Sequence, residues 1–149
     1  MAWDSFVTVL DKIVDVLKTD ANLTAFCKTL GKAQTVRKGL KKREEILINE
    51  LPIIMLTAPQ QTSEQAASGV LYKNYTLRLY CGFDEPDRVK AVDNLIKFEE
   101  FVEQALLNST SLDSMVALLV LGNSANDEGF YHPAYFFAKD FTVTAERLI

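Results

Sequence analysis

Cysteine and histidine, which build many metal and catalytic sites, are scarce in this sequence. The chain has two cysteines, Cys27 and Cys81, and a single histidine, His132. The cysteines lack the close spacing of metal ligands, and no other residues complete a tetrahedral site around them. We therefore expect no metal site and no cofactor. We also expect two buried free thiols in a reducing cytosol rather than a disulfide.

Glycine and proline are also few, at six and four of 149 residues, and no low-complexity stretch or internal repeat is visible. The longest uninterrupted apolar runs, residues 51–56 and 115–121, are far too short to span a bilayer. Acidic residues interrupt the first apolar stretch, so we expect no secretory signal and no membrane partner. A hydrophobic fraction of 48% and a charged fraction of 24% instead fit one soluble globular domain spanning residues 1–149.

No catalytic constellation stands out. His132 has no nucleophile partner in a recognisable signature, so we interpret it as a loop or packing histidine. Asp84, Glu85 and Asp87 could hold a hard cation, but carboxylates at the start of a helix are better explained by capping. We predict that the chain is not an enzyme. An unfamiliar site around His132 and Tyr131 is kept as the alternative.

The basic residues are unevenly distributed. Residues 21–43 contain seven of the 16 basic residues and no acidic one, whereas all 20 acidic residues lie elsewhere. Such a segment attracts phosphates or an acidic protein surface. It has no aromatic interleaving and no recognised binding motif, so we expect no sequence-specific nucleic acid. A solvated loop and a subunit interface both remain open, and the residues that we assign to the interface are Arg37, Lys38, Lys41, Lys42 and Arg43.

The periodicity of the apolar residues predicts the secondary structure. The expected elements are helices at 4–18 and 20–31, an exposed strand at 34–40, a buried strand at 51–57, a loop or mobile arm at 59–69, a half-buried strand at 70–81, a long helix from 84–87 to 108–111, an apolar strand at 115–121, a turn at 122–129 and a strand at 135–147. Strands grouped around one long helix indicate an α+β fold rather than a doubly wound one. We expect a mixed, largely antiparallel sheet of four to five strands with two main amphipathic helices packed against it.

Two further patterns concern the core. The apolar stripe predicted for the long helix consists of Val89, Val92, Leu95, Ile96, Val102, Ala105 and Leu106. The consecutive Phe136 and Phe137 place one ring on each face of a strand. Either both faces are covered within the monomer or one ring waits for a partner, and we favour core packing.

Two short motifs and the order of the predicted elements resemble those of a known protein family. The segment INELPII at residues 48–54 leads into a buried strand, and DFTVTAE at residues 140–146 forms the terminal strand. With the N-terminal amphipathic helix, the basic stretch and the long alternating strand, this order is similar to that of the tail-terminator (tail-completion, tail-to-head joining) proteins of long-tailed phages. The similarity spans nearly the whole chain.

The resemblance implies a structural role without a catalytic residue. A homo-oligomeric ring, typically a hexamer, would sit on the last ring of tail-tube protein, stop polymerisation and join the tail to the head connector protein. The protein would then be found in the virion, at the head-proximal end of the tail, and in the host cytoplasm during assembly. A head-completion or connector ring and a monomeric or dimeric protein-binding adaptor are the alternatives. Outside the basic segment, the residues that we assign to an interface are Gln61, Glu64 and Arg78.

Overall fold

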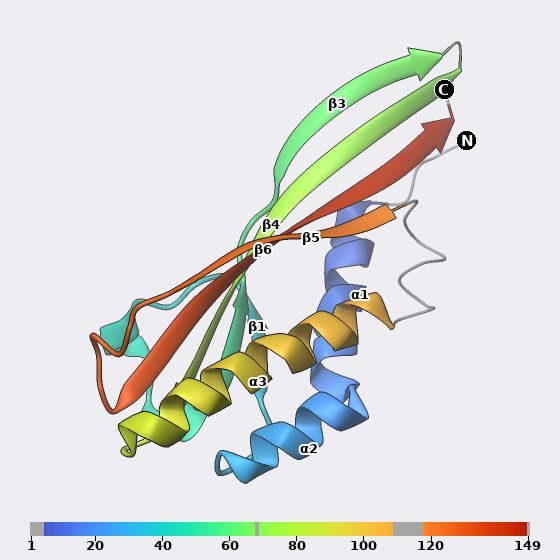
Figure 1. Cartoon of the computed structure of the whole chain (residues 1–149). Helices are drawn as coiled ribbons and strands as arrows, with labels where there is room; N and C mark the ends of the chain where they lie inside the picture. The colour runs from blue at the N-terminus through green and yellow to red at the C-terminus, as the bar shows by residue number, and fades with distance from the viewer. Residues whose placement is uncertain (1–4, 68, 109–117, 149) are drawn as a thin grey trace.

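The computed structural model describes residues 5–67, 69–108 and 118–148, which form an α+β fold (Figure 1). The elements in chain order are α1 (Phe6–Thr19), α2 (Ala21–Thr29), β1 (Thr35–Lys38), the short 3₁₀ helices η1 (Arg43–Glu45) and η2 (Ile48–Glu50), β2 (Ile53–Leu56), β3 (Gln60–Ala67), β4 (Val70–Asp84), α3 (Arg88–Leu107), β5 (Leu118–Asn126) and β6 (Ala134–Leu148). The predicted fold class is therefore confirmed, with six strands in the described part of the chain instead of four to five.

The fold is built around one mixed sheet with the strand order β1-β2-β4-β6-β5. Strand β3 also pairs with β4. Only β1 and β2 are parallel, with Thr35 opposite Ile53. The centre of the sheet is a ribbon of β4 and β6, antiparallel along all 15 residues from Val70 opposite Leu148 to Asp84 opposite Ala134. On the other edge of β4, β3 pairs with its first half and β2 with its second half.

The three helices cover one face of this sheet (Figure 1). Side chains alternate along a strand, so the odd-numbered residues of β4 and β6 point toward the helices. The buried core on this side includes Leu77, Leu79, Cys81, Phe83, Phe137, Phe141 and Val143 from the ribbon. Phe98 of α3 lies at its centre, with ring centroids 5.4 Å from Phe137 and 6.1 Å from Phe83. The predicted alternation of β4 is confirmed.

Side-chain caps begin α1, α2 and α3. Ser5, Asp20 and Asp87 accept hydrogen bonds from backbone N–H groups of α1, α2 and α3, at 3.2 Å from Val7, 2.9 Å from Leu23 and 2.9 Å from Val89. Asp87 therefore acts as the predicted cap. Asp20 does the same for the short helix.

The predicted loop at 59–69 is wrong, because residues 60–67 form strand β3. The sequence there has no apolar alternation, since β3 packs no face against the helices. The backbone groups on one of its edges pair with the long β4 instead, from Gln60 opposite Thr76 to Ala67 opposite Val70. The figure shows β3 and the adjacent ends of β4 and β6 projecting beyond the helices (Figure 1). We call this projection the arm: residues 60–67, 70–76 and 142–148.

The predicted turn at 122–129 is wrong in its first half. Strand β5 continues to Asn126 because β6 is long enough to pair with it past a register shift between Leu121 and Ser124. The chain turns afterwards, where Glu128 and Gly129 have positive φ angles of 55° and 77°. Residues 115–117 of the predicted strand lie outside the described residues.

The predicted core stripe of α3 is partly wrong. Val102, Ala105 and Leu106 are buried as expected, whereas Val89, Val92 and Ile96 are 76%, 60% and 50% exposed. Ala91 and Phe98 hold α3 against the sheet, and α2 lies along one flank of the helix. Among the described residues no element covers the opposite flank, so these three apolar side chains remain in solvent.

Candidate interaction site

The face of the sheet opposite the helices is called the open face. It is partly covered by residues 39–52, which we call the covering segment. Backbone contacts tie it to β2, with the Gly39 N–H donating to the Leu56 carbonyl at 2.7 Å and the Lys41 N–H to the Met55 sulfur at 3.3 Å. Inside the segment, the Lys41 ammonium binds both oxygens of Glu50 at 3.0 and 2.8 Å, and the Leu47 N–H donates to Glu50 at 2.9 Å. These bonds fix η1 and η2 although neither has a buried residue.

The charge on Glu50 is stabilised by these bonds. The hydrogen bond from Lys41 and then that from the Leu47 N–H lower the pKa of Glu50 below its ordinary value. The carboxylate therefore stays ionised at neutral pH and keeps the covering segment closed on itself.

Arg43 anchors the middle of the covering segment to the sheet. Its guanidinium carbon lies 4.1 Å from the ring centroid of Tyr131 and 4.8 Å from that of Phe136, which is cation–π geometry. The Phe136 ring lies directly over Gly82 of β4, where a Cβ atom would overlap it. The prediction that Phe136 and Phe137 both pack within the monomer is confirmed. The Phe136 ring is 5% exposed and its covering is Arg43.

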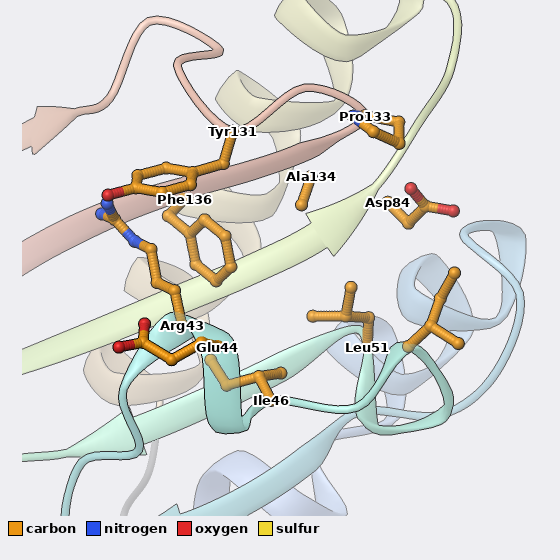
Figure 2. A pocket seen from close by; sticks show the side chains of 10 residues that line it. Arg43, Glu44, Ile46, Leu51, Asp84, Tyr131, Pro133, Ala134 and Phe136 are labelled. Atoms are coloured by element: carbon orange, nitrogen blue, oxygen red, sulfur yellow. The ribbon is translucent and has the colours of Figure 1, made fainter.

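A hollow of about 360 Å³ opens beside these residues (Figure 2). Its lining is mostly apolar, with Arg43 and Glu44 at one end and Asp84 near Pro133 at the other. A second hollow of about 320 Å³ adjoins it and shares Arg43, Tyr131 and Phe136. Ile48, which lines the first hollow, is 73% exposed. Its neighbour Leu47 is 61% exposed, and Phe130, which packs against Tyr131, is 81% exposed.

A larger hollow of about 560 Å³ lies on the opposite, helical face of the sheet. It runs between the N-terminal half of α3 and the turn after β5. The lining consists of Arg88, Ala91, Val92, Leu95, Ile96, Asn126, Glu128, Gly129 and Tyr135. Because Val89, Val92 and Ile96 are exposed beside it, this flank of α3 is a second apolar surface.

The structure neutralises two of the seven basic residues of the basic segment within the chain. Lys38 binds Asp11 of α1 at 2.6 Å and Lys41 binds Glu50, so both have the counter-charge that the local sequence lacks. Arg43 is held by aromatic rings. Lys42 is exposed and has no ion pair with a described residue. Arg37 is half-buried opposite Met55, and its Nε has no hydrogen-bond partner in the described part of the chain.

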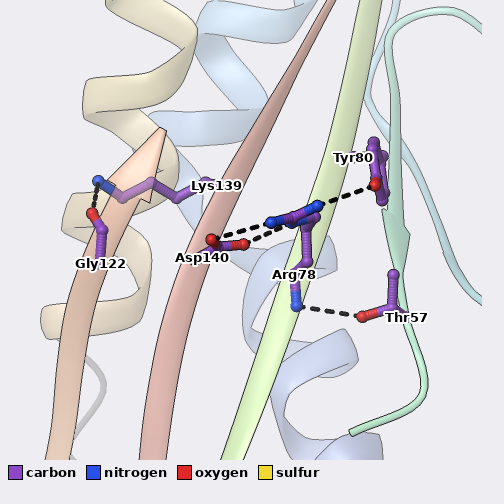
Figure 3. Close-up of polar contacts among 6 residues, drawn as sticks. All are labelled: Thr57, Arg78, Tyr80, Gly122, Lys139 and Asp140. Carbon is purple, nitrogen blue, oxygen red and sulfur yellow. Dashed lines mark hydrogen bonds and ion pairs between the residues drawn. The ribbon is translucent and has the colours of Figure 1, made fainter. Parts of the chain in front are cut away.

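The other residues assigned to an interface lie on β3 and β4. Arg78 forms two hydrogen bonds to Asp140, at 2.6 and 3.1 Å, and one to the Tyr80 hydroxyl at 3.3 Å (Figure 3). Asp140 first and Tyr80 second raise the pKa of Arg78, and Arg78 lowers the pKa of Asp140. Gln61 is exposed on β3. Glu64 is in β3 as well, with its side chain outside the described residues. The structure does not bring these residues together with the covering segment into one site.

The residues considered for catalysis are occupied by contacts within the chain. His132 Nδ1 lies 2.8 Å from the hydroxyl of Tyr135, whereas Tyr131 faces Arg43. Both cysteines are buried, as predicted. Burial raises the pKa of the Cys27 thiol to about 12 and raises that of Cys81 well above its ordinary value. Both thiols are therefore protonated and poor nucleophiles at neutral pH.

The described residues contain no group of three or more His, Cys, Asp and Glu side chains that could hold a metal ion. Among the same residues, no helix has the length and hydropathy to cross a membrane. A scan against protein-family models finds no match, and no curated protein matches the sequence. The two adjoining hollows on the open face, the hollow on the helical face and the arm are the candidate interaction surfaces of the described residues.

Proposed function

We propose that this chain is a structural virion protein that assembles into a hexameric ring, caps the tail tube of a long-tailed phage and joins it to the head connector. Its partners are further copies of itself, the tail-tube protein and the connector protein. This function needs extended surfaces rather than a catalytic site, and it accounts for the resemblance in the order of elements.

The observation that carries the proposal is the arm. Its three strands project beyond the helices (Figure 1), and its described side chains contribute Tyr75, Val143 and Ala145 to the core. On the open face, Asn74 is half-buried and Thr76 is exposed, and on β3 Gln61 is exposed. A polar projection adds little to the stability of its own monomer. It is explained by contact with another subunit, and its outer strand β3 leaves one edge free within the described residues.

The experiment is a measurement of mass by light scattering over a concentration series, at low and at moderate salt, followed by electron microscopy of the assembled fraction. We expect a closed assembly of about six subunits with a central opening. The purified protein should then be added to tail-tube protein of the same phage during polymerisation. Shortened tubes carrying a ring at one end support the proposal.

A shortened-arm variant gives the decisive control. Replacing residues 61–73 by a short glycine-containing turn removes most of β3 and the first residues of β4 from the arm and leaves the described helical core in place. A variant that still terminates tubes like the wild type would contradict the proposal that the arm takes part in capping. A wild-type chain that remains monomeric and leaves the tubes unchanged would favour the adaptor alternative.

A further inference from the structure

We propose that neighbouring copies of this chain continue one another's sheet, with strand β3 of one copy pairing with strand β5 of the next. Both strands lie at edges of the sheet, on opposite sides of the β4–β6 ribbon (Figure 1). The inference rests on the proposed ring, and it names the contact between subunits that would build it.

Each of the two strands has one edge without a partner strand. Among the described residues, β3 pairs only with β4, and β5 pairs only with β6. None of the nine residues of β5 is buried, and residues 60–63 of β3 are all exposed. The backbone N–H and C=O groups on these outer edges are therefore available to a further strand.

The hydrogen bonds of Arg78 show which residues of β3 carry these groups. The Arg78 N–H donates to the Thr57 hydroxyl, and its carbonyl accepts from the Thr57 N–H, so the even-numbered residues of β4 direct their backbone groups toward β2 and β3. This direction alternates along an antiparallel strand. The even-numbered residues of β3 opposite them therefore bond to β4, whereas Gln61 and Ser63 direct their N–H groups outward.

Neither edge has the features that keep edge strands from pairing. Natural proteins shorten such strands or place charges and prolines in them. The edge strand β1 is protected in this way, since it has four residues that include Arg37 and Lys38. In contrast, β5 has nine residues with no charge and no proline, and β3 has eight residues with Glu64 as the one charged residue. This composition is expected of edges that are paired in the assembled protein.

The topology makes β5 of a second copy a suitable partner for β3. Strand directions alternate across β3, β4, β6 and β5, so β3 and β5 run in opposite directions. A neighbouring copy in the same orientation therefore brings its β5 antiparallel to β3. The two edges also lie at the same height of the sheet. One row crosses all four strands and consists of Gln60, Thr76, Thr142 and Val120.

A two-fold contact would satisfy only one of the two edges. Pairing of β3 with β3 leaves β5 of both copies without a partner, and pairing of β5 with β5 does the same to β3. Pairing of β3 with β5 satisfies both edges through one kind of contact. Such a contact is heterologous, and it closes into a ring with two different ends, as a subunit between a tube and a connector requires. The occupant of the β3 edge is therefore β5 of a second copy.

The first test identifies which edges meet. One variant carries Thr62→Cys in β3 and the other carries Val120→Cys in β5, at two exposed side chains on the open face. A short crosslinker that joins two thiols is added to each variant alone and to their mixture. We expect crosslinked dimers in the mixture and not in either variant alone, because the two thiols then lie on different edges. The wild type, in which Cys27 and Cys81 are buried, is the control.

The second test removes the outward donors of β3. Gln61→Pro with Ser63→Pro deletes two N–H groups that point away from β4. The matched control, Gln61→Ala with Ser63→Ala, changes the same side chains but keeps both N–H groups, and circular dichroism verifies that both variants fold. We expect the proline variant to assemble at least about tenfold more weakly than the alanine variant in light scattering, because each contact loses two hydrogen bonds.

The outcomes separate this inference from the proposed ring. If the wild type forms the closed assembly but the mixture gives no crosslinked dimers, or the proline and alanine variants assemble equally, the pairing of β3 with β5 is overturned and the ring stands. Crosslinked dimers within either variant alone indicate a two-fold contact, which overturns the inference and counts against the ring. A wild type that stays monomeric at all concentrations overturns the pairing and also counts against the ring.

Discussion

The two halves of the β4–β6 ribbon share one continuous antiparallel ladder but differ in what surrounds them. The inner half consists of residues 77–84 of β4 and 134–141 of β6. Here Leu79, Cys81 and Phe83 are completely buried under the helices, and the covering segment lies over the other face. Among the described side chains of the arm, Tyr75, Val143 and Ala145 are buried, and Phe6 of α1 stacks on Tyr75 with ring centroids 3.5 Å apart.

This difference separates two physical contributions that usually act together. The ladder satisfies backbone groups along the whole ribbon, but a hydrogen bond exchanged with water adds little net stability. Apolar burial is concentrated in the inner half. The inner half therefore holds the fold together, and the arm is maintained as an extension of it that remains available for contacts.

The largest expected effect comes from removing the ring of Phe98, which packs from α3 against the inner half. Phe98→Ala should lower the free energy of unfolding by about 3–5 kcal/mol, because it leaves a cavity between Phe26, Phe83 and Phe137. Denaturant unfolding followed by circular dichroism measures the loss. The matched control Phe130→Ala removes a ring that is 81% exposed and should change stability by no more than about 0.5 kcal/mol. Equal losses in the two variants would contradict the assignment of the core.

The next effect concerns Lys139, which joins the inner half of β6 to α3 and β5. Its side chain is 7% exposed, lies 3.2 Å from Glu103 and 3.7 Å from Glu99, and donates to the Gly122 carbonyl at 3.0 Å (Figure 3). Lys139→Met leaves these acceptors without their partner and should lower the free energy of unfolding by about 1–3 kcal/mol.

A double-mutant cycle, in which Glu99 and Glu103 are changed together as one site, tests whether the loss of stability in Lys139→Met comes from the unpaired carboxylates. Replacing Glu99 and Glu103 by Gln in the Lys139→Met background should recover part of the loss, since the two carboxylates no longer face each other without the ammonium. If the three changes are simply additive, Lys139 stabilises the junction by packing alone.

A smaller and local effect is expected in the arm. The Thr144 hydroxyl donates to the Asn74 side chain at 2.7 Å across the ribbon. Asn74→Ala should cost about 0.2–1 kcal/mol, and hydrogen exchange should accelerate at residues 70–76 and 142–148 but not at 77–84, since the arm opens without unfolding the core. Faster exchange in both halves would mean that the ribbon opens as one unit.

The smallest effect is at the junction of the two halves, where Arg78 pairs with Asp140. Both groups are partly exposed, so Asp140→Asn should lower the stability by less than about 1 kcal/mol at neutral pH. Arg78 lowers the pKa of Asp140 in the folded state. The stabilisation of the folded state by the Arg78–Asp140 pair is therefore complete above the ordinary aspartate pKa of about 4. It disappears as the pH falls through the lower pKa that Asp140 has in the folded state. Unfolding curves of the wild type and the variant should converge in that acidic range, and a constant difference would contradict the pair.

Much of the fold could be predicted because the relevant signals are local. The alternation of Leu77, Leu79 and Cys81 reflects a strand with one covered face, and Asp20 and Asp87 mark helix starts through bonds to nearby backbone groups. The strand β3 could not be predicted in this way, because its polar sequence has no periodicity and its pairing depends on the length of β4. The exposed Val89, Val92 and Ile96 were assigned to the core for a similar reason, since periodicity identifies an apolar stripe but not whether a neighbour covers it.

The candidate site could be predicted from the sequence even less well than the fold. The sequence shows seven basic residues without a local acid, but Asp11 and Glu50, which neutralise two of them, are brought close only by the fold. By itself the sequence determined the fold class, the caps of α2 and α3 and the buried thiols, all of which depend on composition and near-neighbour spacing. Only the tertiary structure decided which charges stay unpaired and which apolar side chains stay exposed, because both depend on contacts between residues far apart in the chain.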